Sequence, residues 1–183
     1  MHITAAALEQ GLDEIRRSPA DRGRVELIIR RPAQNEREVL TEATLDCEEG
    51  LVGDTWLVRG NRHTPDGSAH PEEQVTLMNA RAAALVAGGV ERRGLAGDQL
   101  YVDLDLSEDN LAAGTRLELG SAVIEITAKP HTGCAKFADR FGRDALRFVN
   151  SPVGRQLRLR GVNAKVVVAG TVRVGDEIRK RLS

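Results

Sequence analysis

The sequence has few aromatic residues, only two cysteines, no long hydrophobic run and almost no excess of charge of either sign. Aromatic residues make up 3% of the 183 residues, which argues against a platform on which single-stranded nucleic acid would stack. The 26 basic and 27 acidic residues give a net charge of -1, so the strongly basic balance of a duplex-binding protein is missing. We therefore expect no nucleic acid among the partners of this protein.

No apolar run approaches the roughly 20 residues that a membrane-spanning helix needs. The first residues, MHITAAALEQGLDEIRR, also lack the basic start and apolar stretch of a secretory signal. We therefore expect a cytoplasmic protein with no membrane partner. In that compartment the two cysteines, Cys47 and Cys134, are expected to be free thiols.

The sequence also lacks the common cofactor motifs. Two cysteines are too few for a conventional iron–sulfur cluster. No Cys-x-x-Cys or His-Glu-x-x-His pattern indicates a zinc site, and no glycine-rich loop indicates a bound nucleotide.

The chain instead contains many short apolar or alternating segments, separated by glycine-rich turns. Helical spacing or capping residues predict helices over 4–17, 80–87, 135–141 and 144–150. Many short strands with few helices predict a mainly β fold, with a barrel-like or sandwich core and several short peripheral helices. The expected strands are 24–31, 37–46, 74–78, 100–106, 116–119, 122–127, 165–169, 171–174 and 177–179.

Cys134 is the strongest candidate for a functional residue. It lies in the segment KPHTGCAKF, after a strand and at the start of an expected helix. The positive end of that helix, with Lys136 and His131 nearby, would favour a thiolate, while Thr132 and Gly133 can offer backbone N–H groups to an anion. A thiolate suits a nucleophile, a sulfur carrier or a ligand for a soft metal. The alternative is a small buried apolar residue, the commonest role of a free cysteine.

Two loops share the form Gly-x-x-Gly-Asp, ending at Asp54 and Asp98. They are either ordinary turns or two loops that converge over one site, and we predict that they converge near Cys134. Cys47 follows a strand among carboxylates, which disfavour a thiolate, so we expect a structural role for it.

Several arginines follow Cys134 in the sequence. Guanidinium groups bind phosphate with two parallel hydrogen bonds, although a solvated surface is the alternative for most of them. The arginines concerned are Arg140, Arg143, Arg155, Arg158 and Arg160.

Taken in order, the motifs around this cysteine resemble the MOSC family, named for the C-terminal domain of molybdenum cofactor sulfurases. They are GLVGD, QVTL, GLAGDQL, LAAGTRLELG, the cysteine segment, RGVNAKV, and the final stretch from Gly170 to Asp176. The resemblance covers residues 24–183. Residues 1–23 lie outside it, as an N-terminal helical extension typical of a free-standing, bacterial-type member.

The resemblance implies a β-barrel with a pocket for the molybdenum cofactor. Cys134 would be the functional cysteine, which either carries sulfur as a persulfide or binds molybdenum directly. By the same resemblance, the pterin phosphate would be held by arginines, with Arg160 the best candidate. The residues assigned to cofactor binding are Asp54, Asp98, Gln99, His131, Thr132, Arg140, Arg143 and Arg160.

The sequence departs from the family at two positions. Many relatives have arginine where this chain has Thr55, and asparagine where it has Gln99. The chain also lacks the pyridoxal-phosphate domain of full sulfurases and the iron–sulfur domain of some reductase relatives. A partner is therefore implied, either an electron donor or a sulfur donor such as a pyridoxal-phosphate cysteine desulfurase.

Three functions remain open at this point. The first is a cofactor-binding protein that transfers sulfur or reduces N-hydroxylated compounds through its cysteine. The second is a non-catalytic carrier of the molybdenum cofactor. The third is a barrel that binds another anionic ligand.

Overall fold

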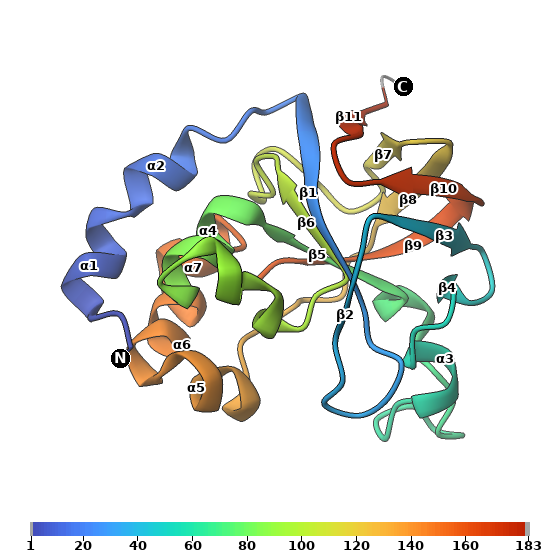
Figure 1. Ribbon diagram of the computed structural model, residues 1–183, viewed down its shortest axis with the longest axis horizontal. Coiled ribbons are helices and arrows are strands. Elements are labelled where there is room, and N and C mark those ends of the chain that lie inside the picture. Colours follow the sequence, from blue (N-terminus) through green and yellow to red (C-terminus); the bar gives the residue numbers. More distant parts are fainter. Residues whose placement is uncertain (1, 182–183) are drawn as a thin grey trace.

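The computed structural model describes residues 2–181, and Figure 1 shows a barrel with most of the helices gathered on one side of it. The strands are β1 (Arg22–Arg30), β2 (Glu38–Leu40), β3 (Glu42–Asp46), β4 (Gly50–Leu51), β5 (Val75–Asn79), β6 (Leu100–Asp103), β7 (Arg116–Leu119), β8 (Ala122–Ile126), β9 (Val162–Val168), β10 (Gly170–Arg173) and β11 (Glu177–Lys180). The helices are α1 (Ala5–Gln10), α2 (Leu12–Arg16), α3 (Trp56–Arg59), α4 (Ala80–Ala87), α5 (Ala135–Phe141), α6 (Arg143–Asn150) and α7 (Pro152–Gln156). Two 3₁₀ helices, η1 (Pro71–Glu73) and η2 (Val90–Ala96), complete the described elements.

Seven strands form the closed barrel, in the order β11-β7-β8-β9-β5-β6-β1, and pairing of β1 with β11 closes the ring. β5 and β6 run parallel, and the other neighbouring pairs are antiparallel. β2 pairs antiparallel with the C-terminal end of β1. β10, β3 and β4 form a small separate sheet. The barrel and its short peripheral helices confirm the predicted fold.

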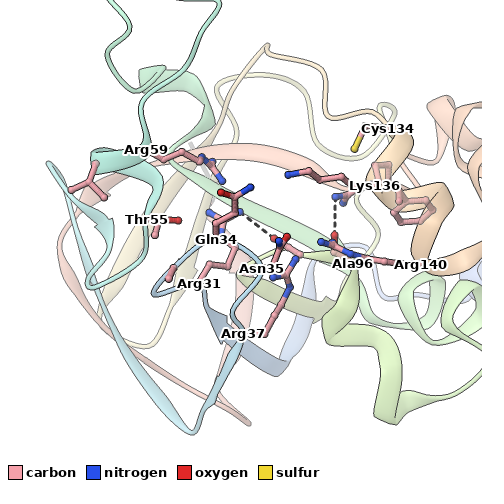
Figure 2. Close-up of a pocket in the computed structure, with 15 residues that line it drawn as sticks. Arg31, Gln34, Asn35, Arg37, Thr55, Arg59, Ala96, Cys134, Lys136 and Arg140 are labelled. Atoms are coloured by element: carbon pink, nitrogen blue, oxygen red, sulfur yellow. Dashed lines mark hydrogen bonds between the residues drawn. The ribbon is translucent and has the colours of Figure 1, made fainter.

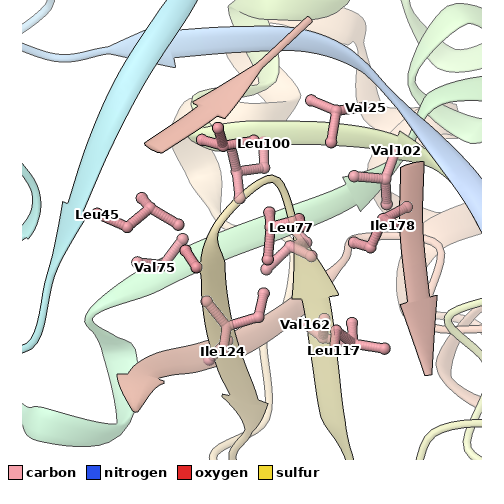
Figure 3. Packing of buried hydrophobic residues seen from close by; sticks show 14 of the residues in the cluster. Val25, Leu45, Val75, Leu77, Leu100, Val102, Leu117, Ile124, Val162 and Ile178 are labelled. Carbon is pink, nitrogen blue, oxygen red and sulfur yellow. The ribbon is translucent and has the colours of Figure 1, made fainter. Parts of the chain in front are cut away.

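Alternating residues of the strands fill the interior of the barrel (Figure 3). In β6, Leu100 and Val102 point inward, while Tyr101 between them faces the helices. This follows from the period of two in a strand, which places successive side chains on opposite faces. Full burial of each aliphatic side chain contributes roughly 1.5–3 kcal/mol. The barrel is therefore a packed core, and a binding site has to lie at its rim.

A second core lies between the barrel and the helices. Leu8 of α1 and Ile15 of α2 are buried there with Phe137 and Phe141 of α5. The expected single helix over 4–17 is divided at Gly11, where an added Cβ would lie 2.5 Å from a methyl group of Leu85. The first strand begins at residue 22, just before the boundary expected at residue 24.

The structure also differs from the expected elements elsewhere in the chain. The strand predicted over 37–46 is divided at Thr41 into β2, which pairs with β1, and β3, which pairs with β10. The strand predicted over 100–106 ends at Asp103. The short helices α3 and α7 lie in segments where no helix was predicted. No helix among residues 2–181 is long and apolar enough to pass through a bilayer.

Candidate functional site

A cavity of about 470 Å³ opens beside the barrel, between the β1–β2 loop, α3, the end of η2 and the start of α5 (Figure 2). Six basic side chains line it, and no acidic residue does. The volume is within the range of small-molecule sites. The basic residues are Arg31, Arg37, Arg59, Lys136, Arg140 and Arg160.

Asp54 fixes the position of Arg31 on one side of the cavity. Its carboxylate is fully buried and accepts hydrogen bonds from Nε and Nη2 of Arg31, at 2.8 and 2.7 Å. The same carboxylate accepts the backbone N–H of Trp56 at the start of α3. Arg31 also donates to the carbonyl oxygen of Gly97, 3.1 Å away. This arginine therefore joins the first Gly-Asp loop to the second.

Asp98 has the corresponding role in the second loop. Its buried carboxylate binds Nη1 of Arg160 and accepts a hydrogen bond from Nε2 of His131 at 2.9 Å. Burial alone would raise the pKa of Asp98, but Arg160 and His131 outweigh it and hold that pKa well below its usual range. Burial and the charge of Arg160 lower the pKa of His131, against the opposing effect of Asp98. His131 is therefore a neutral donor to an ionised carboxylate near neutral pH.

Arg160 joins three elements at the wall of the cavity. Besides Asp98, it donates to the carbonyl oxygen of Ala96 at 3.1 Å, and its guanidinium lies 5.2 Å from the ring centroid of Phe137. Both Nη atoms are thus used within the chain, while Nε is buried without a partner. The main contribution of Arg160 is to hold the second loop, the turn before β9 and α5 together.

The other four cations have no such partner. Within residues 2–181, no carboxylate lies within 4.0 Å of Arg37, Arg59, Lys136 or Arg140. Burial and repulsion by Arg140 lower the pKa of Arg37, whose Nε is also buried without a hydrogen bond. Figure 2 shows Arg37, Arg59 and Lys136 pointing toward the middle of the cavity from three different elements. An anion bound there would relieve this repulsion.

Cys134 lies at the edge of the same cavity as the N-terminal capping residue of α5. Its thiol is exposed and free, which excludes the alternative of a buried apolar residue. Asn150 holds the preceding loop through two hydrogen bonds with the backbone of Gly133, at 3.0 and 3.1 Å. Cys47, for which a structural role was expected, is also exposed and free, but it does not line this cavity.

Comparison with known proteins assigns the family. The family model of the MOSC domain matches residues 64–179. The chain belongs to the MOSC domain family. This confirms the resemblance drawn from the motifs, and the family is associated with molybdenum cofactor binding.

Solved structures share the MOSC fold at low sequence identity. The YuaD protein from Bacillus subtilis is 17% identical, with a TM-score of 0.61 over 88% of this chain and 97% of that one. YiiM from Escherichia coli is 19% identical, with a TM-score of 0.56 over 87% of this chain and 70% of that one. At these identities the likeness shows the fold alone. No curated protein matches the chain in sequence.

The two Gly-Asp loops of this MOSC domain do meet at the cavity of Cys134. Thr55 and Gly97, which flank the two aspartates, line it. Asp54 and Asp98 themselves lie behind the wall with fully buried side chains. Any effect of these aspartates on a ligand therefore passes through Arg31, Arg160 and the loop backbone.

The remaining predicted residues lie in different places. Arg140 lines the cavity, but Gln99 is fully buried and accepts both hydrogen bonds of Thr76, from N and from Oγ1. His131 and Thr132 line a second cavity. Arg143 lies at a separate hollow beside the N-terminal residues, so the structure does not bring it to Cys134.

Three arginines of the cavity are not among the residues that the sequence motifs predict. Arg31 and Arg37 flank the turn of residues 32–35 between β1 and β2, and this pair of basic residues around one turn was the available signal. Arg59 follows Thr55 by four residues on α3 and therefore faces the same side. Within residues 2–181, no three His, Cys, Asp or Glu side chains are grouped as ligands for one metal ion.

Proposed function

We propose that this MOSC protein binds the molybdenum cofactor in the cation-lined cavity, with Cys134 as its functional thiol. One observation carries the proposal: four cations, which have no acidic partner among residues 2–181, converge on a cavity that has an exposed free cysteine at its edge. A phosphate dianion is costly to bury without charged donors, and this cavity supplies an excess of them.

The residues present fit a phosphate-bearing pterin. Arg37, Arg59 and Arg140 can each offer a guanidinium to the phosphate, and no carboxylate in the described part of the chain holds any of the three. Thr55 stands where many relatives have an arginine, which weakens the family pattern at that position. Arg59 lies one helical turn later and lines the same cavity, so it can supply the missing guanidinium.

Bound cofactor would supply a molybdenum centre for redox or sulfur-transfer chemistry, which the chain alone does not offer. The protein's own part is to hold the anion, to present the Cys134 thiol as a soft ligand or as a sulfur carrier, and to aim Lys136 into the cavity. Sulfur transfer and reduction of N-hydroxylated compounds are the two proposed activities. Each requires a partner, an electron donor for the reduction and a sulfur donor for the transfer.

Metal and pterin content tests the binding step directly. The protein would be purified from a host that makes the cofactor, and molybdenum and pterin would be measured per folded chain. We expect both to fall in Arg59→Ala and Cys134→Ser. Arg62→Ala and Cys47→Ser are matched controls, because both residues are exposed and lie outside the cavity, and they should retain wild-type content.

A wild-type protein without molybdenum or pterin from such a host would refute the proposal in favour of a barrel for another anion. Where cofactor is retained, turnover of an N-hydroxylated compound with a reductant tests the reductase activity. Mass spectrometry of a persulfide on Cys134 tests sulfur transfer. Retention without either result would indicate a carrier.

A further inference from the structure

A second cavity, of about 410 Å³, lies on the other side of Arg160. Residues 127–132, in the segment before Cys134, form one wall, and Arg158 with residues 160–163, at the start of β9, forms another. Arg160 borders both cavities, whereas Cys134 and the four unpaired cations line only the first. This second cavity is therefore not needed for the function proposed above, and its ligand can be considered separately.

The cavity has its own excess of positive charge. Arg155, Arg158 and Lys129 line it, against a single acidic residue, Glu108. Within residues 2–181, no carboxylate lies within 4.0 Å of Arg155 or Arg158, and Lys129 is paired only loosely, at 3.9 Å, with Glu73 outside the cavity. Two guanidinium groups at one cavity without carboxylate partners favour an oxyanion.

Arg158 is held there at a conformational cost. Its φ of 48° lies in the left-handed region, which non-glycine residues rarely adopt. Its Nη1 donates only to backbone carbonyl oxygens, including that of Leu111 at 2.5 Å. Burial lowers its pKa, and the nearby Glu108 offsets this only in part. Strained backbone of this kind is concentrated at functional sites.

The rest of the wall indicates the form of the ligand. Val149, Pro130 and Val162 give it an apolar side. Asn163 is 3% exposed, and its Nδ2 donates to the carbonyl oxygen of Lys129, which fixes the shape of the wall. A free inorganic anion would leave most of this cavity and its apolar side uncovered.

We propose that the second cavity binds a small organic carboxylate. Its carboxylate would contact Arg155 and Arg158, and its compact apolar body would lie against Val149, Pro130 and Val162. The inference does not rest on the proposed function, because a ligand in the second cavity needs neither the first cavity nor its cofactor.

Calorimetric titration of the purified chain with sodium benzoate, at constant ionic strength, tests the proposal. We expect saturable binding that is about tenfold weaker in Arg155→Ala, which loses a charge-assisted contact, and in Arg158→Lys, which loses the two parallel hydrogen bonds of a guanidinium group. Arg155 is exposed, and Arg158→Lys keeps a charged donor that can replace the hydrogen bond to the carbonyl oxygen of Leu111, so the fold should survive both changes. Arg59→Ala, in the first cavity, should bind benzoate as the wild type does.

Three results would overturn the inference. Unchanged benzoate affinity in both second-cavity variants would remove the arginines from the site. Loss of binding in Arg59→Ala alone would assign benzoate to the first cavity. Equal affinity for benzoate, acetate and inorganic phosphate would show a general anion site that makes no use of the apolar wall.

Discussion

Replacement of Asp98 by asparagine should destabilise the protein far more than its small change in shape implies. The carboxylate is fully buried and is the only acidic partner, among residues 2–181, of the buried Arg160. The substitution would leave that guanidinium charged, buried and without a counter-charge. It would also force one of the two donors, Arg160 or His131, to face the amide nitrogen of the new side chain.

The size of the effect follows from this geometry. Removal of one partner of a buried ion pair typically costs 3–5 kcal/mol, because the remaining charge stays desolvated. Domains of this size unfold with a free energy of about 5–15 kcal/mol, so Asp98→Asn should remove a large fraction of the total. The loss should be measured as the free energy of urea unfolding at pH 7.

A matched control and a double variant make the prediction specific. Asp139 is exposed, and Asp139→Asn should change the free energy of unfolding by less than about 0.5 kcal/mol. The double variant Asp98→Asn with Arg160→Met should lose less stability than the two single variants lose in sum, because no buried charge is left without a partner. A cost below about 1 kcal/mol for Asp98→Asn would refute the reasoning, since it would mean that Arg160 finds water or another partner easily.

Three further predictions concern reactivity, backbone space and pH. The ratio of the alkylation rate with anionic iodoacetate to that with neutral iodoacetamide should be several-fold higher at Cys134 than at Cys47, because cations surround the first thiol and acidic residues the second. Added salt should reduce the difference, and equal ratios at the two thiols would contradict the prediction. Gly161→Ala, whose Cβ would lie 2.2 Å from a carbonyl oxygen of β5, should cost more than roughly 3 kcal/mol in urea unfolding. Gly175→Ala, with a similar positive φ but open space, should cost only about 1–2 kcal/mol, and equal costs would argue against the close contact. The pKa values of His131 and Asp98 are both lowered on folding, so the free energy of unfolding should fall as pH drops below about 6.5, where the histidine acts, and further below about 3.9, where the aspartate acts. Urea midpoints that stay constant from pH 7 to pH 3 would exclude this.

Local sequence patterns were sufficient to predict most strands of the barrel. The expected strands 116–119 and 122–127 are separated by only Gly120-Ser121, a spacing typical of a hairpin, and Leu119 does pair with Ala122 across it. The break at Thr41 could not be predicted in the same way, because the alternation of Val39, Thr41, Ala43 and Leu45 in the sequence continues across it. Only the pairing partners of these two strands, which lie far away in the sequence, separate them into different sheets.

In the candidate site too, some residues are predictable from their sequence neighbours, whereas others depend on contacts between distant parts of the chain. Cys134 was found from its immediate neighbours, since its segment alone places it at a helix start. The sequence marks Asp98 and Arg160 separately, but their pairing across 62 residues depends on the closed barrel. The sequence therefore suggests a phosphate donor at Arg160, where the structure shows a positioning residue. Arg143 was expected near Cys134, yet it begins the next helix and lies at another hollow.

The pairing of β1 with β11 also has a consequence for the order of folding. The ring is joined between residues 22–24 and 177–179, almost the full length of the chain apart. During synthesis, residues 22–24 of β1 and the outer edge of β7 must therefore stay unpaired until β11 has been made, and contacts of such long separation form slowly. Exposed strand edges are sites of aggregation, so a newly made chain is most vulnerable in this interval.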